Sequence, residues 1–550
     1  MSQLIDGITF GEMLKGGLQN LKANLQTVND LNVFPIPDGD TGDNMYATIL
    51  GGVRALKADD DVLGNVAKLV GEGMLLGARG NSGVILSQMF AGITKVFSEH
   101  EKADVNILAN AFKTGVAYAY ASVMEPVEGT MLTVLREATE YATEKIDKNS
   151  SIVSFITDYL DETRRSVDRT PELLYVLKEA GVVDSGGEGI YYIFDGFLKA
   201  LKGEKISDVP VSVHNDSKTV DFSLFNEDSV MEFGYCTEFL LQLTKNKTDI
   251  ENFSLEDMKK RLGEFGDSLV AVMNGSIVKI HVHTLTPGKV LEYAQSFGEF
   301  LTLKIENMTL QHNETVEKKV STEFKKNLVR KNLAVVTVAN GDGLISTFKE
   351  LGADIVIDGG QGKNPSIEVF LKAYDAVNSD VIFVLPNNGN IMMAAKESAK
   401  LYKQSEVHVI NSKTLGDGYA VLGALDLEGK SVEEIISQME SDMKSSTSLL
   451  VSKANRDTKI SDLEIKEGNY IGFEGKEILV SNQDKVSCAI DLMKKKGADE
   501  KEFVVAFYGI DVTESDKEEF ESLISQEFSG AEFYAISGDQ EIYDFIIVLQ

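Results

Sequence analysis

The stretch NVFPIPDGDTGDNM, residues 32–45, decides how the first part of this chain folds. Two prolines stiffen its first half, while Gly39 and Gly42 let the backbone turn where larger side chains would clash. Apolar residues then recur at helical spacing, at Met45, Ile49, Val53 and Leu56. We therefore expect a tight loop that runs into the N-terminus of a helix, where backbone N–H groups favour anions.

The same loop carries three carboxylates, those of Asp38, Asp40 and Asp43. Acidic side chains in a glycine-broken loop can hold a hard divalent cation against phosphate. The alternative is a solvated turn in which an aspartate caps the following helix. For Asp43 the alternative is an acidic residue in the first helical turn, where it favours the helix dipole.

Two further glycine-hinged helix entrances follow. GARGNSG spans residues 77–83, with Asn81 or Ser82 as the N-cap, and VDSGG spans residues 183–187. Three such entrances within one domain would converge on a nucleotide. None of them matches the Walker pattern, so we do not expect an ordinary P-loop.

Helical spacing continues on both sides of these motifs. One apolar stripe precedes the loop, at Leu14, Leu18, Leu21, Leu25 and Val28. Comparable stripes follow near residues 85–98, 106–122 and 130–146, and alternating strand patterns are almost absent. The sequence therefore predicts an all-α domain over residues 1–205, followed by a polar linker over residues 206–228.

Strand-like runs appear after this linker, at residues 239–243, 269–272 and 277–282, with helical segments between them. They predict a small α/β or α+β domain over residues 229–313. The mixed-charge segment 314–331 is a second linker or the exposed face of a helix.

An α/β rhythm occupies residues 332–550. Short buried-strand runs at residues 333–338, 355–357, 381–385 and 407–410 are each followed by a helical segment, and further strands are expected near residues 448–452, 502–508 and 543–549. This alternation predicts a parallel sheet with ligands or partners at the carboxyl ends of its strands. The loops GGQ (359–361), NPS (364–366) and PNNGN (386–390) lie at those ends.

Composition restricts the class of protein. The 550 residues include 86 acidic and 54 basic side chains, giving a formal charge of −32, which repels nucleic acid and anionic lipid. The start of the chain does not resemble a secretion signal, and no apolar run approaches the length of a membrane span. The two cysteines lie far apart in sequence and suit a reducing compartment. We therefore expect a cytoplasmic protein without a transmembrane segment or a nucleic acid partner.

Eight ordered motifs resemble the catalytic subunits of bacterial fatty acid kinases, the FakA family. They occur at residues 32–45, 77–88, 128–133, 181–187, 234–238, 281–284, 385–388 and 456–460, and so extend over essentially the whole chain. The amino-terminal part of that family is related to the DhaL subunit of dihydroxyacetone kinases. The resemblance implies a DhaL-like nucleotide-binding helical barrel or bundle, a small middle domain, and a C-terminal domain with DegV-like architecture.

Site residues follow from the matched motifs. Asp38 and Asp40 match carboxylates that hold Mg²⁺ on the phosphates of ATP, and the residues matched to nucleotide-lining segments are Asn44, Asn81, Ser82, Thr130, Met131 and Asp184. Dihydroxyacetone kinases carry a third aspartate shortly before the Asp-Gly-Asp triplet, where this chain has Asn32 and Val33. Asp43 is the candidate that would compensate.

The implied reaction transfers the γ-phosphoryl group of ATP to a fatty acid carboxylate and gives an acyl phosphate. A carboxylate is already ionised near neutral pH, so the enzyme needs charge neutralisation rather than a general base. Mg²⁺, helix N-termini and Arg79 would supply it; alternatively, Arg79 forms a structural salt bridge. The family uses a separate DegV-type protein to carry the fatty acid, and the C-terminal domain is the expected docking surface.

His281 and His283 are two residues apart in an alternating run, so both project from one face of a strand. With Cys236 they could bind zinc, or they could be surface histidines on an edge strand. The resemblance favours zinc, and it also suggests a homodimer formed through the middle domain.

Two other functions compete with the fatty acid kinase. A dihydroxyacetone-type kinase would act on a small polyol but would leave the residues after the helical domain unexplained. A regulatory scaffold that senses nucleotide would have no need for two metal-binding carboxylates.

Overall fold

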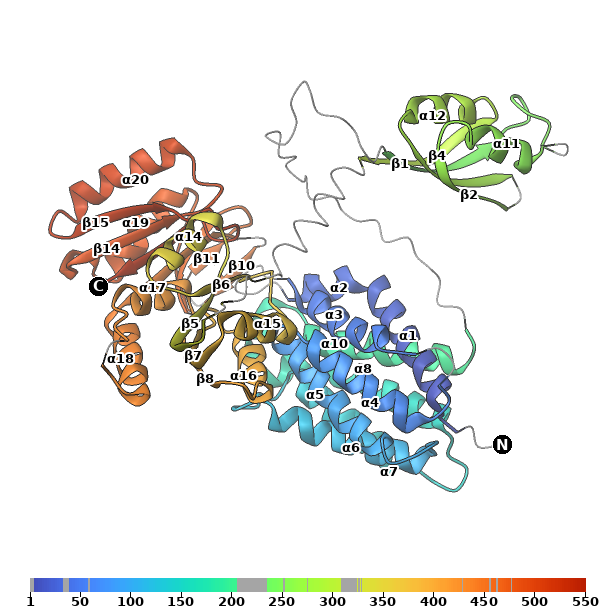
Figure 1. Ribbon diagram of the computed structural model, residues 1–550, viewed down its shortest axis with the longest axis horizontal. Coiled ribbons are helices and arrows are strands. Elements are labelled where there is room, and N and C mark those ends of the chain that lie inside the picture. Colours follow the sequence, from blue (N-terminus) through green and yellow to red (C-terminus); the bar gives the residue numbers. More distant parts are fainter. Residues whose placement is uncertain are drawn as a thin grey trace. The chain divides into compact units, whose positions relative to one another are not determined.

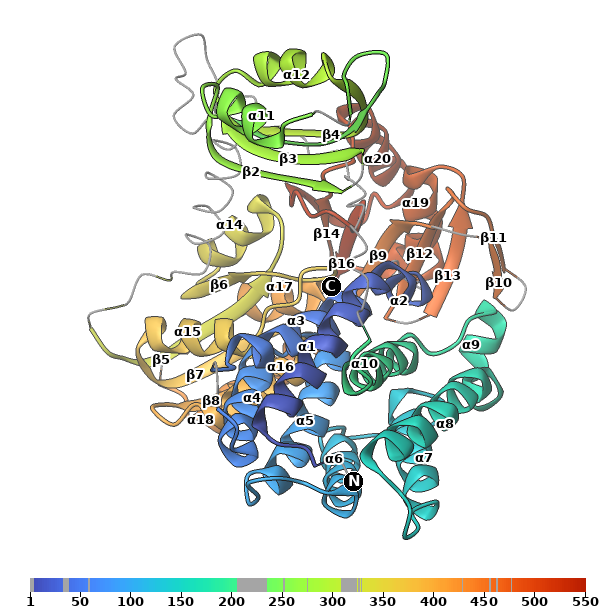
Figure 2. The same ribbon diagram turned by 90° about the vertical axis from the view of Figure 1, so that its right-hand side faces the viewer.

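The computed structural model describes residues 4–32, 39–57, 60–204, 235–250, 253–274, 276–307, 324, 327, 329–427, 429–454, 457–460, 463–475 and 477–550. The chain forms two compact units. One comprises Met1–Val211 together with Phe324–Gln550, and the other comprises Ser212–Glu323 (Figures 1 and 2). Both predicted linkers lie largely outside the described residues.

The helical part, residues 4–204, is built from α-helices, as the apolar stripes predict. Its helices are α1 (Gly7–Ala23), α2 (Leu25–Leu31), α3 (Thr41–Arg54), α4 (Leu63–Gly77), α5 (Gly80–Phe97), α6 (Val105–Ala121), α7 (Met131–Glu144), α8 (Ile152–Leu173), α9 (Tyr175–Ala180) and α10 (Ser185–Leu201). Aromatic rings lie at the centre of its core: the ring of Tyr159 is 5.1 Å from that of Phe112 and 4.9 Å from that of Phe194.

The first apolar stripe differs from the prediction in one respect. Leu14, Leu21 and Val28 are all buried, but they belong to two helices, because α1 ends at Ala23 and α2 begins at Leu25. The Asn24 side chain donates to the carbonyl of Asn20 at 2.8 Å, and such side-chain bonds compete with helix continuation.

The middle part is a four-stranded antiparallel sheet with order β2-β3-β1-β4. Its elements are β1 (Tyr235–Leu243), α11 (Leu255–Leu262), β2 (Asp267–Asn274), β3 (Ile277–Thr284), α12 (Pro287–Gln295) and β4 (Gly298–Asn307). The three predicted strand runs lie in β1, β2 and β3. Figure 2 shows α11 and α12 on the same side of this sheet, and buried residues of both helices share a core with those of the strands.

The C-terminal part, described from residue 329, begins with the predicted parallel sheet. Its strand order is β6-β5-β7-β8, and all three strand pairs are parallel. The elements are β5 (Lys331–Ala339), α14 (Asp342–Glu350), β6 (Ile355–Asp358), α15 (Ile367–Val377), β7 (Ser379–Leu385), α16 (Met392–Leu401), β8 (Glu406–Val409), α17 (Leu415–Gly423) and α18 (Val432–Ser445).

A second, mostly antiparallel sheet of six strands follows, with order β13-β12-β9-β16-β14-β15, and a small hairpin, β10-β11, accompanies it. The elements are β9 (Thr447–Lys453), β10 (Thr458–Ile460), β11 (Leu463–Ile465), β12 (Tyr470–Glu474), β13 (Glu477–Asn482), α19 (Lys485–Lys495), a 3₁₀ turn (Ala498–Glu500), β14 (Phe503–Tyr508), α20 (Glu514–Glu527), β15 (Glu532–Ser537) and β16 (Phe545–Leu549). The three strands predicted here are β9, β14 and β16.

The parallel sheet packs against the helical part. Ala78 and Val84 share one buried cluster with residues of α15 and α16, including Ile367 and Ala394. The N–H of Ile367 also donates to the carbonyl of Ala78 at 3.3 Å. These contacts place the loops after β6 and β7 beside the beginnings of α3 and α5. No helix among the described residues is long and apolar enough to cross a membrane.

Candidate functional site

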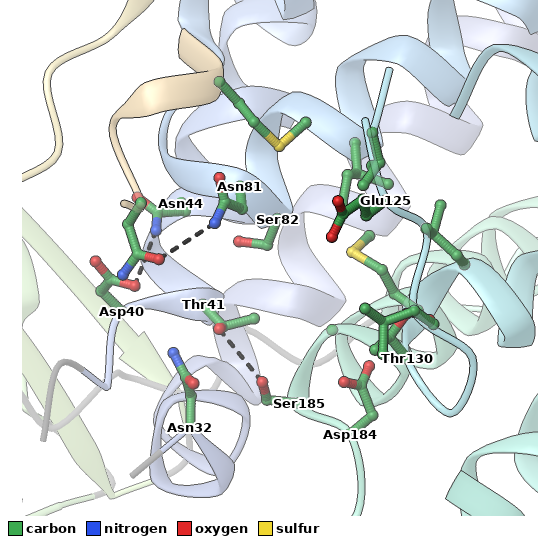
Figure 3. A pocket seen from close by; sticks show the side chains of 18 residues that line it. Asn32, Asp40, Thr41, Asn44, Asn81, Ser82, Glu125, Thr130, Asp184 and Ser185 are labelled. Carbon is green, nitrogen blue, oxygen red and sulfur yellow. Dashed lines mark hydrogen bonds between the residues drawn. The ribbon is translucent and has the colours of Figure 1, made fainter. Parts of the chain in front are cut away.

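Four helices begin at one cavity of about 350 Å³ (Figure 3). Residues from the first turns of α3, α5, α7 and α10 line it: Thr41, Asn44, Asn81, Ser82, Met131, Ser185 and Gly186. The partial positive charges of four helix N-termini therefore face one volume, an arrangement that favours an anion. The hydroxyl of Ser185 donates to that of Thr41 at 3.3 Å, which joins the starts of α10 and α3.

Apolar side chains also line the cavity. They are Ile85, Val123, Val127, Leu132 and Met393. A volume of this size, with apolar walls and a few polar groups that converge, is typical of a small-molecule site.

Asp40 stands immediately before α3, but its side chain does not cap that helix. Asn29, from α2, takes this role instead: its Oδ1 accepts from the N–H of Gly42 at 2.7 Å, and its Nδ2 donates to Asp43 at 2.7 Å. The capping alternative for Asp40 is therefore wrong. Because Asn29 satisfies the helix end, the Asp40 carboxylate is not used as a cap, and Asp40 is among the residues that line the cavity.

Two side-chain amides donate to the Asp40 carboxylate, which is only 7% exposed. Asn44 Nδ2 lies 2.9 Å from Oδ1, and Asn364 Nδ2, from the loop after β6, lies 2.6 Å from Oδ2. Neither amide carries a charge, so neither of them neutralises the carboxylate, which can still bind a cation.

Gly80 is required where α5 meets this cluster. Its φ of +55° is left-handed, and a Cβ there would lie 2.5 Å from Asn44 Nδ2 and 3.1 Å from Asn364 Nδ2. A larger residue would displace the amides that hold Asp40.

Asn81 and Ser82 extend the cluster along α5. Asn81 Nδ2 donates to Asn390 Oδ1 at 3.2 Å, again across to the C-terminal part (Figure 3). The Oδ1 atom of Asn81 is buried, with no hydrogen-bond partner among the described residues. A buried amide oxygen without a partner is unfavourable unless a ligand or water satisfies it.

Thr130, Met131 and Asp184 line the opposite side of the cavity. Asp184 caps α10, with its Oδ2 accepting from the N–H of Gly187 at 2.7 Å. Burial raises the pKa of Asp184 to about 6, although the N–H groups of Gly187 and Met131 favour its charged form. This carboxyl group is therefore easier to protonate than an ordinary aspartate.

Two other predicted residues, Asp43 and Arg79, do not line the cavity. Asp43 is exposed and paired with Asn29, and Arg79 is exposed beside the cavity without lining it. Desolvation and the nearby Arg54 lower the pKa of Arg79, while Glu368 of α15 opposes this shift. Asp38 lies outside the described residues.

The zinc prediction concerns β1 and β3, where Cys236 pairs directly with His283 in the antiparallel register. His281 is two residues further along β3. The side chains of all three lie outside the part of the chain that the structure describes, and the described residues contain no group of three or more potential metal ligands of the His, Cys, Asp and Glu types. The zinc site therefore stays a prediction.

Several residues at the site were not predicted from sequence. Asn29, Asn32, Glu125, Asn364, Asn390 and Met393 hold or line it. The loops that contain Asn364 and Asn390 were expected to bind a ligand or partner at the ends of parallel strands. Their proximity to the helical part had no sequence signal.

Three family models together match nearly the whole chain. The DAK2 domain matches residues 35–199, the middle domain of FakA-like fatty acid kinase proteins matches residues 232–315, and their C-terminal domain matches residues 334–550. A curated relative, protein YloV of Bacillus subtilis, is 38% identical over 554 residues, covering 99% of both chains.

The chain belongs to the FakA-like family of fatty acid kinase proteins. It is a kinase-like protein with a DAK2 domain. An uncharacterized Staphylococcus aureus relative, SAR1202, is 36% identical over the full length of both chains.

Solved structures of other proteins are more distant. The dihydroxyacetone kinase of C. freundii, in complex with AMP-PNP and Mg²⁺, is 20% identical with a TM-score of 0.29, covering 36% of this chain and 35% of that one. The Streptococcus pneumoniae fatty acid kinase B3 protein, loaded with linoleic acid, is 13% identical with a TM-score of 0.29, covering 40% of this chain and 99% of that one. Likenesses at this level carry no argument about function.

Proposed function

We propose that this protein transfers the γ-phosphoryl group of ATP to the carboxylate of a fatty acid that a DegV-type carrier protein presents. One observation supports this best: four helix N-termini and a buried carboxylate, Asp40, converge on one cavity. The FakA-like family models that match the middle and C-terminal parts support the choice of acceptor.

The polar groups around Asp40 fit Mg²⁺. The hard oxygen donors are the Asp40 carboxylate and the Oδ1 of Asn81, which has no hydrogen-bond partner in the part of the chain that the structure describes. Asp38 would add a second carboxylate. When bound, Mg²⁺ would neutralise phosphate charge and orient the γ-phosphoryl group. In the loaded enzyme, Arg79 would add positive charge beside the phosphates, and Asp43 would be a further Mg²⁺ ligand.

The protein's own task is to bring two anions together. The described residues that line the cavity include no Lys, Arg or His, so the helix N-termini of α3, α5, α7 and α10 supply the positive potential there. The phosphates would lie against Asn44, Asn81, Ser82 and Thr130, while the apolar walls beside Met131 would hold the base. An ionised acceptor needs no general base, so positioning and charge stabilisation are enough.

The same proposal has four further parts. They are the DegV-type carrier, a zinc ion on Cys236, His281 and His283, a homodimer and a cytoplasmic location. The family resemblance supports the carrier, the zinc ion and the homodimer, and the pairing of Cys236 with His283 also supports the zinc ion. The acidic composition supports the cytoplasmic location. The C-terminal part is the proposed docking surface for the carrier.

The test mixes the purified full-length chain with MgATP and a DegV-type protein loaded with oleate. We expect acyl phosphate, trapped as the hydroxamate by hydroxylamine, only when both proteins are present. Dihydroxyacetone is the competing acceptor, because the DAK2 match favours it. Phosphate transfer to dihydroxyacetone, or ATP consumption that ignores the loaded carrier, would contradict the proposal, and nucleotide binding without transfer would favour the scaffold.

A further inference from the structure

The C-terminal part contributes directly to the cavity in the helical part. Asn390 and Met393 line it, and Asn364 donates to Asp40 from a position 324 residues away in sequence. Neither the DAK2 match nor the nucleotide motifs extend to these residues.

The loop that carries Asn364 is fixed in place. Gly360 and Lys363 exchange two backbone hydrogen bonds, of 3.1 and 3.0 Å, which close the turn before it. Pro365 follows with its restricted backbone, and Ser366 caps α15. Because the N–H of Ile367 binds the carbonyl of Ala78 at 3.3 Å, the loop is anchored two residues from Gly80.

The contact between Asn364 and Asp40 is buried and charge-assisted. Asn364 is 6% exposed, and its amide lies 2.6 Å from the carboxylate and 3.5 Å from Asn44 Oδ1. Its own Oδ1 is buried with no hydrogen-bond partner among the described residues. Burying an amide oxygen without a hydrogen bond lowers the stability of the fold, and an apolar residue at this position would avoid that cost. Fold stability alone therefore does not explain why asparagine occupies position 364.

We propose that the C-terminal part completes the metal and nucleotide site of the same chain, with Asn364 as a positioning residue for Asp40. The inference rests on the proposed role of Asp40 as a Mg²⁺ ligand. Asn364 fixes the orientation of the carboxylate and leaves its charge intact, as partners of metal-binding carboxylates do in other proteins. Asn390 holds Asn81 on the neighbouring helix in the same way.

The test is a Mg²⁺ titration of ADP binding to the full-length protein, without any phosphoryl acceptor. Asn364→Ala should raise the Mg²⁺ concentration for half-maximal binding by about 10-fold or more, the usual effect of losing a partner of a metal ligand. Lys363→Ala is the matched control: it alters the same loop, but its exposed side chain pairs with Asp358 rather than Asp40, so the midpoint should not move. Asn364→Ser, with a shorter donor, should lie between the wild type and Asn364→Ala.

A double-mutant cycle separates positioning from general structure. If Asn364 acts through Asp40, then adding Asn364→Ala to Asp40→Asn changes the Mg²⁺ midpoint no further. An unchanged midpoint in Asn364→Ala, fully additive effects, or an equal loss of ADP affinity at every Mg²⁺ concentration would each overturn the inference. The Mg²⁺ midpoint could shift in Asn364→Ala even though the wild-type protein fails to phosphorylate carrier-bound fatty acid. That result would support the role of Asn364 and would refute only the proposed acceptor.

Discussion

Replacing Asp184 by asparagine should make stability less dependent on pH. Burial raises the pKa of Asp184 from its ordinary 3.8 to about 6 in the folded protein. The folded state therefore binds this proton more tightly than the unfolded state does, and the resulting stabilisation is complete below pH 3.8 and lost as pH rises through 6. An asparagine side chain has no proton to lose, so Asp184→Asn should gain stability relative to the wild type as pH rises from 4 to 7.5.

The size of the effect follows from the shift. Two pKa units correspond to about 3 kcal/mol, and because water reaches part of this half-buried side chain we expect about 1–3 kcal/mol. Asparagine caps helices as well as aspartate does, so the substitution keeps the cap of α10. If the hydrogen bond from the N–H of Met131 to this side chain is lost, the loss is the same at both pH values. The assay is thermal unfolding of both proteins without ligand at pH 4 and pH 7.5, where about 1 kcal/mol moves the midpoint by roughly 2–4 °C in a domain of this size.

Asp6→Asn is the matched control, because Asp6 also caps a helix but shows the opposite shift. The N–H of Thr9 lowers the pKa of Asp6, so its stabilising effect is present above pH 3.8 and is lost as pH falls through the folded pKa. Because this change lies below pH 4, the difference in stability between Asp6→Asn and the wild type should stay nearly constant from pH 4 to pH 7.5. A difference between Asp184→Asn and wild type that stays constant from pH 4 to pH 7.5 would refute the reasoning.

Four further predictions concern the site and the middle part. Asp40→Asn should abolish phosphoryl transfer and weaken Mg²⁺-dependent ADP binding by at least about 10-fold, with little change in thermal midpoint; full activity would remove the metal role. Asn29→Ala should lower stability by about 1–2 kcal/mol in thermal unfolding, because α3 loses its cap, and an unchanged midpoint would mean that the bond to Gly42 is not needed. Gly80→Ala should weaken ADP binding more than Gly203→Ala does, since both have positive φ but only Gly80 lies against side chains; equal effects would leave backbone strain as the sole cause. His281→Ala should lower the zinc content measured by elemental analysis, and equal zinc in both proteins would exclude that ligand.

Local patterns predicted local structure well. The helical spacing after Met45 became α3, and the strand runs from residue 333 to residue 410 became a parallel sheet. These elements are set by periodicity and by turn residues that are close together in sequence. The break at Asn24 was missed because the apolar stripe continues across it. The strand β4 (Gly298–Asn307) was not predicted, although Leu301, Leu303 and Ile305 alternate there with polar residues.

The site was less predictable, since its contacts connect distant segments. Sequence motifs indicated which helix entrances would converge, and the structure places Asn44, Asn81 and Asp184 at one cavity. No spacing rule connects Asn29 with Gly42 or Asn364 with Asp40, because these contacts depend on how whole helices and sheets pack.

The bond between Asp40 and Asn364 also sets an order of events during synthesis. The helical part can be translated and can begin to fold while the second half of the chain is still unmade, but this contact cannot form until residue 364 has left the ribosome. A truncated chain that stops before β6 would keep every nucleotide motif and still lack the amide that braces Asp40. An incomplete chain therefore lacks one hydrogen bond of the site that the complete chain forms.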